Sequence, residues 1–149
     1  MDIKNELYKF CVDAIEQKLT TIHAVLNSAQ DSANHETKST AGDKNDTARA
    51  MAHLESEKNA KQLAEINKLK KVLPYLKNHN TKTEVDLGSV VKTTGSNYYI
   101  SISLGKITIN NEDYYTVSAV TPIGKLLLGK KVGDNFTFNG KTAQITAIL

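Results

Sequence analysis

Apolar side chains recur near the start of the chain in alternating steps of three and four residues. This heptad-like spacing predicts a long helix that lies along a second helix at a shallow angle. Polar residues replace the pattern between Asp31 and Thr47, where Gly42 is the one glycine before residue 88, so we expect the first helix to end there. The residues of the stripe are Tyr8, Val12, Ile15, Leu19, Ile22, Leu26, Ala29 and Ala33.

A second helical pattern runs from Ala48 to Leu76. Its apolar stripe is dense near the end and thin near the start, which predicts that the two helices pack more weakly toward the turn between them. Pro74 should end or kink this helix, because proline removes a backbone donor and disfavours helix at the residue before it. The dense part is Ile66, Leu69, Leu73 and Leu76, and the thin part is Ala48, Met51, Ala52 and Ala60.

Short runs of β-forming residues follow, separated by glycine and asparagine. Between the fourth and fifth runs, Thr121, Pro122 and Gly129 mark the cap, the first turn and the stop of a two-turn helix. One short helix against a twisted sheet makes this part α+β. The predicted strands are Ser89–Lys92, Tyr98–Ser103, Lys106–Ile109, Tyr114–Val120, Asn135–Phe138 and Thr142–Leu149, with Ile100, Ile102 and Leu104 on one shared face and Tyr115, Val117 and Ala119 on another.

Composition excludes several classes of protein. The 149 residues carry a net charge of +3, which is too small for nonspecific binding along the phosphate backbone of nucleic acid. No apolar run approaches the roughly 20 residues of a membrane span, and the start of the chain lacks the pattern of a secretory signal. The single cysteine, Cys11, cannot form an internal disulfide, so we expect a buried thiol in a soluble, cytoplasmic protein.

Two segments, Thr121–Asp134 and Ala41–Ala48, each place glycine and aspartate at fixed spacing. Together they resemble the GreA/GreB family of bacterial transcript cleavage factors: the first is similar to the signature of the family's carboxy domain, and the second is similar to its tip motif, with Asp46 where glutamate is commoner and Thr47 where asparagine is usual. The matched positions are Pro122, Gly129, Lys130, Gly133 and Asp134 in the first segment, and Gly42, Asp43 and Asp46 in the second.

The resemblance implies an α+β fold in three parts. Residues 1–77 would form an antiparallel α-helical coiled-coil finger with an acidic tip near 41–47, and residues 78–82 a linker. Residues 83–149 would form a small antiparallel sheet domain with one short helix, related to FK506-binding proteins (FKBP-like).

The family's activity implies roles for the tip acids. The finger would enter the secondary channel of RNA polymerase, where Asp43 and Asp46 would help to hold a shared Mg²⁺ and position the water that cuts backtracked RNA. Mg²⁺ is often held by one or two protein carboxylates together with phosphate oxygens. The protein would not be an enzyme itself, would bind no cofactor alone, and would act as a monomer on the polymerase and the RNA 3′ end, away from membranes.

Other readings of the same residues stay open. Asp43 and Asp46 are also suited to cap a helix and complement its dipole. Lys44, Arg49 and Lys38 flank the acids and would contact polymerase or RNA, or else form a solvated face. The resemblance implies that Pro122, Gly129, Lys130, Gly133 and Asp134 help to dock the carboxy domain on the polymerase, although caps and turns explain them equally well. Lys58, Lys61, Lys68, Lys70 and Lys71 would line the RNA path or form an ordinary helix surface.

Two alternative functions remain. The protein would occupy the polymerase channel as a modulator or inhibitor without cleavage, or it would be a peptide-binding or prolyl-isomerase adapter. The absence of Trp and the presence of just three Phe argue against the aromatic pocket that the adapter needs. The four histidines show no metal-ligand spacing, and no nucleophile triad or phosphate-binding loop is present, which argues against an independent enzyme.

Overall fold

A computed structural model describes residues 2–37, 44–77 and 83–149; within these, side chains are described except at 29–37, 44–49 and 52. The chain divides into two compact units, one made of residues 1–14 and 71–149 and the other of residues 15–70. The predicted linker at 78–82, and the domain boundaries drawn from it, lie outside the described residues.

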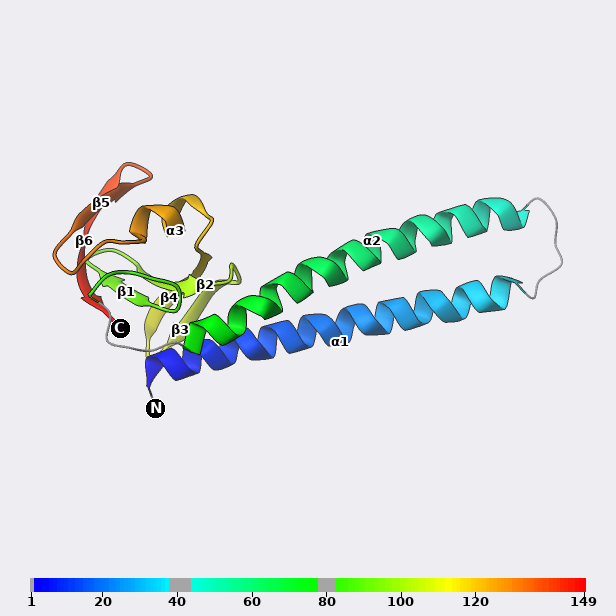
Figure 1. The fold of residues 1–149 in the computed structure, drawn as a ribbon, viewed down its shortest axis with the longest axis horizontal. Coiled ribbons are helices and arrows are strands. Elements are labelled where there is room, and N and C mark those ends of the chain that lie inside the picture. Colours follow the sequence, from blue (N-terminus) through cyan, green and yellow to red (C-terminus); the bar gives the residue numbers. More distant parts are fainter. Residues whose placement is uncertain (1, 38–43, 78–82) are drawn as a thin grey trace. The chain divides into compact units, whose positions relative to one another are not determined.

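Two antiparallel helices form the unit of residues 15–70, and they lie side by side in Figure 1. They belong to α1 (Ile3–Thr37) and α2 (Lys44–Val72). Ile15 and Ile22 are buried in the seam, and Leu19 and Leu26 are half-buried, which confirms this part of the predicted stripe; Ala29 and Ala33 lie outside the described side chains.

The apolar seam weakens toward the turn, as predicted. On α2 the residues Leu63, Ile66 and Leu69 are half-buried, whereas Met51 and Leu54 are 66% and 64% exposed. The helix begins at Lys44, four residues before the predicted Ala48, because the first turn of a helix favours polar and acidic residues over apolar ones.

Pro74 acts as predicted. The α-helix ends at Val72, and the chain continues as a 3₁₀ helix, η1 (Leu73–Lys77), in which Leu73 and Leu76 are buried. A tighter helix accommodates proline where the α-helical hydrogen bond to its nitrogen is lost.

Six strands form one sheet in the order β3-β4-β2-β1-β6-β5. All six predicted strands are present, with ends shifted by at most two residues. Tight turns at Asn110–Asn111 and Asn139–Gly140, each with positive φ, close the β3–β4 and β5–β6 hairpins. The strands are β1 (Val90–Thr93), β2 (Asn97–Ser101), β3 (Gly105–Ile109), β4 (Glu112–Ser118), β5 (Asn135–Phe138) and β6 (Lys141–Ile148).

The sheet is mixed, so the prediction of an antiparallel sheet is wrong at one pairing. β2 pairs with β4 in parallel, with Tyr98 beside Tyr115 and Ile100 beside Val117. The connection 102–104 reverses the chain into β3, the Asn110–Asn111 turn reverses it again, and β4 then inserts between β3 and β2. Because β2 ends at Ser101, Ile102 and Leu104 lie in this connection and do not extend the strand face of Ile100.

The sheet is covered on both faces. The helix α3 (Pro122–Leu127) lies over one face (Figure 1), above a core of Val85, Val91, Ile100, Ile123, Leu127, Phe136 and Ile145. On the other face Tyr99 and Tyr114 are buried, and Cys11 of α1 contacts Ser101 of β2.

Cys11 joins α1 to this second face. Its thiol donates a 3.7 Å hydrogen bond to the hydroxyl of Ser101 in β2. Burial raises the pKa of the Cys11 thiol from its ordinary 9.0 to about 11, and the Ser101 hydrogen bond offsets a smaller part of the rise. The buried thiol expected from the sequence is therefore confirmed.

The raised pKa of Cys11 predicts alkaline destabilisation. Above pH 9 the unfolded chain loses the thiol proton while the folded chain keeps it, so the free energy of unfolding should fall as pH rises toward 11, by at most about 1.4 kcal/mol per pH unit. Urea unfolding at pH 8, 9 and 10 measures this slope. Cys11→Ala should flatten it, and an unchanged slope in that variant would contradict the assignment. Tyr99 and Tyr114, whose pKa values burial also raises, add to the loss at higher pH in both proteins.

Candidate functional site

The segment that carries the carboxy-domain signature begins as a capped helix. Thr121 has extended backbone angles, and its Oγ1 accepts a 3.2 Å hydrogen bond from the Gly124 amide. The same hydroxyl donates to the Ser118 carbonyl at 2.7 Å. Pro122 follows at the first helical position, where its missing N–H costs nothing, so both predicted start signals are confirmed.

Gly124 is the tightest point of this segment. A Cβ at this position would lie 2.1 Å from the Ser118 carbonyl oxygen and 3.0 Å from Thr121 Oγ1. The capping bonds of Thr121 hold Ser118 against the helix, so backbone leaves no room for a side chain. Packing therefore requires a glycine at this position.

The end of the segment is fixed by backbone geometry. Gly129 has φ of +81°, the left-handed conformation that stops helices, and Gly133 has φ of +93°. The Asp134 carboxylate accepts a 2.8 Å hydrogen bond from the Lys131 amide, and the Lys130 carbonyl accepts one of 2.8 Å from Val85. The local fold thus accounts for these signature residues, and their role in docking stays a prediction.

The acidic tip lies largely beyond the described side chains. Asp43, Gly42 and Lys38 fall outside the described residues. Asp46, with Lys44 and Arg49, lies in the first two turns of α2, a position that fits the reading of Asp46 as an acid that complements the start of a helix. Among the residues that the structure describes, no group of three or more His, Cys, Asp or Glu is arranged to hold a metal ion.

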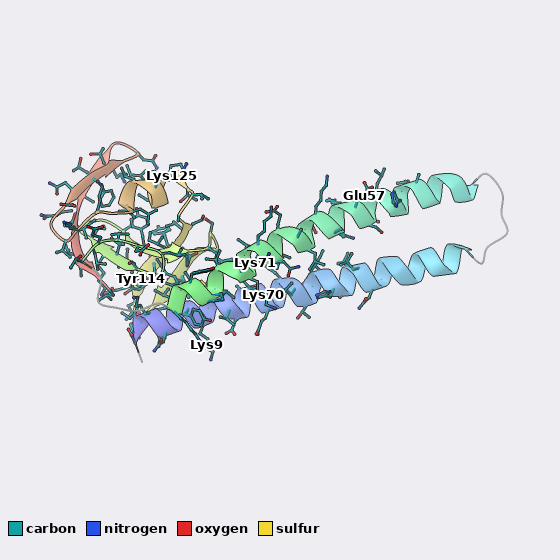
Figure 2. The ribbon with its side chains drawn as sticks, in the orientation of Figure 1. Lys9, Glu57, Lys70, Lys71, Tyr114 and Lys125 are labelled. Atoms are coloured by element: carbon teal, nitrogen blue, oxygen red, sulfur yellow. The ribbon has the colours of Figure 1, made fainter. Side chains whose placement is uncertain are left out.

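Lysines on α2 present an exposed basic surface. Lys58, Lys61, Lys68, Lys70 and Lys71 are all exposed, and Lys70 and Lys71 are labelled in Figure 2. Lys68 pairs with Glu65 at 3.2 Å, with both side chains more than 70% exposed, so this pair is worth little. Exposed ammonium groups are suited to meet an anionic partner, and the role of these lysines along an RNA path stays a prediction.

The structure adds a site that the sequence reasoning missed. A cleft of about 390 Å³ lies in the unit of residues 1–14 and 71–149, which we call the sheet unit. It is lined by Gly95, Ser96, Tyr98, Tyr115, Val117, Ile123, Phe136, Phe138, Asn139, Lys141 and Ala143. Four of the nine aromatic side chains of the protein line it. Strand register therefore gathers these few aromatics in one place, which composition alone does not reveal.

The cleft has a floor of core residues and walls that are partly exposed. Ile123 and Phe136 are 7% and 6% exposed and belong to the core, whereas Tyr98 and Phe138 pack on that core and stay half-buried. The rings of Tyr98 and Tyr115 lie 6.0 Å apart at 37°. Burial raises the pKa of Tyr98, and its hydrogen bond to Ser96 offsets part of the rise. Aromatic residues two positions apart in a predicted strand, such as Phe136 and Phe138, could have predicted an aromatic surface here.

Comparison with solved structures finds proteins that are similar to this chain, and one of them is identified by name. It is the crystal structure of GreA factor homolog 1 (Gfh1) protein of Thermus thermophilus, 22% identical, covering 92% of this chain and 93% of that one with a TM-score of 0.35. No family model and no curated protein sequence matches the chain. None of the described helices is long and apolar enough to cross a membrane. A functional proposal therefore rests on the sequence motifs and on the geometry of each unit.

Proposed function

We propose that this protein is a transcription elongation factor that binds RNA polymerase through its secondary channel and stimulates cleavage of backtracked RNA. The observation that carries the proposal is the position of the acidic motif. Helix α1 ends at Thr37 and α2 begins at Lys44, so Gly42 and Asp43 fall between the two helices in the sequence and Asp46 lies in the first turn of α2.

Exposed apolar residues near the start of α2 support insertion of the helical hairpin, formed by α1 and α2, into a partner. Met51 and Leu54 lie on α2 within three turns of its start and are mostly exposed. Apolar side chains that stay uncovered in a lone protein are suited to contact the wall of a binding partner. The exposed lysines farther along α2 would then face the phosphates of the extruded RNA.

The proposed chemistry belongs to the polymerase. Asp43 and Asp46 would supply carboxylate oxygens, the ligands that Mg²⁺ prefers. A second metal ion, when bound, stabilises the attacking and leaving oxygens of phosphodiester hydrolysis. The protein would then be a stimulator and not an enzyme, because the remaining ligands and the substrate come from the polymerase.

A backtracked transcription complex tests the proposal. Adding the protein to stalled polymerase with labelled RNA should shorten the RNA from its 3′ end and restore elongation. Slower elongation without shortening would support the alternative, in which the protein occupies the channel as a modulator. No effect on either RNA length or elongation would overturn both.

A further inference from the structure

A polar side chain is buried in the seam of the helical hairpin. Asn59 of α2 is 7% exposed, and it lies in the unit of residues 15–70, where the other element is α1. Leu63 and Ile66, both half-buried, follow it at steps of four and three residues. Asn59 therefore continues the stripe of α2 that faces α1, but with an amide in place of an apolar group.

Burial stops between Asn59 and the turn that joins the helices. Every described side chain of α2 from 50 to 58 is exposed, and among the α1 side chains from 23 to 28 just Leu26 is half-buried. The ribbons of α1 and α2 also run apart toward the turn (Figure 1). We call residues 23–28 and 50–58 the distal segment. Asn59 stands at the boundary between this segment and the packed part of the hairpin.

The described contacts of the distal segment do little to hold its two arms together. Val25, Met51 and Leu54 are 43%, 66% and 64% exposed, so they add little burial. The ion pair of His53 with Glu57 at 3.2 Å joins two residues of α2 and does not link α2 to α1. Because local opening costs little free energy where few apolar contacts are buried, the arms need little free energy to separate.

The amide of Asn59 weakens the seam where packing ends. An amide that is buried between helices gives up hydration and adds less apolar area than leucine would. A polar residue at one seam position of a coiled coil accordingly lowers its stability. Leucine at this position would instead extend the stripe of Leu63 and Ile66 by one turn toward the distal segment.

We propose that Asn59 ends the packed seam so that the arms of the distal segment separate locally, and that the partner protein binds the opened form. Opening uncovers Leu26 beside Val25, and both arms can then contact an apolar wall. A partner that binds the opened form has an apparent affinity proportional to the opened fraction. The binding step rests on the proposed function, with RNA polymerase as the partner, whereas the opening itself does not.

Amide hydrogen exchange of the full chain tests the opening. In the unmodified protein, amides at 50–58 should exchange faster than those at 63–69, and Asn59→Leu should slow exchange at 50–58 at least about tenfold. Asn67→Leu is the matched control, because Asn67 is exposed on the same helix and gains the same helix propensity. Equal exchange at 50–58 in the unmodified protein and Asn59→Leu, or equal slowing in both variants, would overturn the proposal.

Binding of fluorescently labelled protein to backtracked polymerase tests the second step. The dissociation constant of Asn59→Leu should rise by about the factor by which its exchange slows, and that of Asn67→Leu should not change. A dissociation constant of Asn59→Leu that equals that of the unmodified protein, while exchange slows, would make Asn59 a structural residue and overturn the binding step. If the unmodified protein does not bind polymerase, the proposed function and the binding step both fail, and the exchange measurement still decides the opening.

Discussion

Replacing Gly124 by alanine is expected to lower the free energy of unfolding of the sheet unit by about 3 kcal/mol or more. The added methyl would lie 2.1 Å from the Ser118 carbonyl oxygen, and this oxygen belongs to backbone held by two bonds from Thr121. Relief of the clash must move α3 or break its N-terminal cap. Urea unfolding followed by circular dichroism measures the loss.

Two other glycines separate this clash from general effects of glycine replacement. Gly95→Ala would bring a Cβ no closer than 3.8 Å to Ala143 and Thr93, so stability should change by less than about 0.5 kcal/mol. Gly129→Ala meets no atom within 4 Å but has φ of +81°, and it should cost about 1 kcal/mol. Similar losses in all three variants would show that crowding at Ser118 is not the cause.

Local sequence signals predicted most of the elements. The two helices, the proline break and the capped helix α3 each depend on residues close together in sequence, such as Thr121 with Gly124. The strands were also found, because their β-forming runs are bounded by Asn and Gly turns. These features need no knowledge of distant contacts.

Features that depend on distant contacts were not predicted. The parallel pairing of β2 with β4 follows from the insertion of one strand between two others, and no local pattern specifies it. On the second face, the hydrogen bond from Cys11 of α1 to Ser101 of β2 joins residues 90 positions apart. Nine aromatics scattered along a sequence likewise do not reveal that four of them share a cleft.

The candidate functional residues also divide into those that local sequence predicts and those that depend on distant contacts. The sequence identified Pro122, Gly129, Gly133 and Asp134, and the structure explains them as caps and turns. It identified Asp46 as a first-turn residue of α2, which the backbone confirms. What the sequence could not supply was Lys141 beside an aromatic cleft, because that pairing arises from the β5–β6 register.

The roles of Asp43 and Asp46 can be separated from helix capping by choice of substitution. Asparagine caps a helix about as well as aspartate, but it cannot supply a carboxylate to Mg²⁺. Asp43→Asn with Asp46→Asn should therefore preserve the hairpin while removing the charge that the proposed mechanism requires. Glu55→Gln with Glu57→Gln is a matched control, because both glutamates are exposed on α2 away from the turn.

The most direct test measures the rate of RNA shortening in backtracked polymerase complexes with these two double variants. If the tip acids act at the polymerase active site, the aspartate variant should lose on the order of 100-fold in cleavage rate while competing for polymerase as well as the unmodified protein, and the glutamate variant should be fully active. Cleavage that persists at the unmodified rate without both carboxylates would contradict the account.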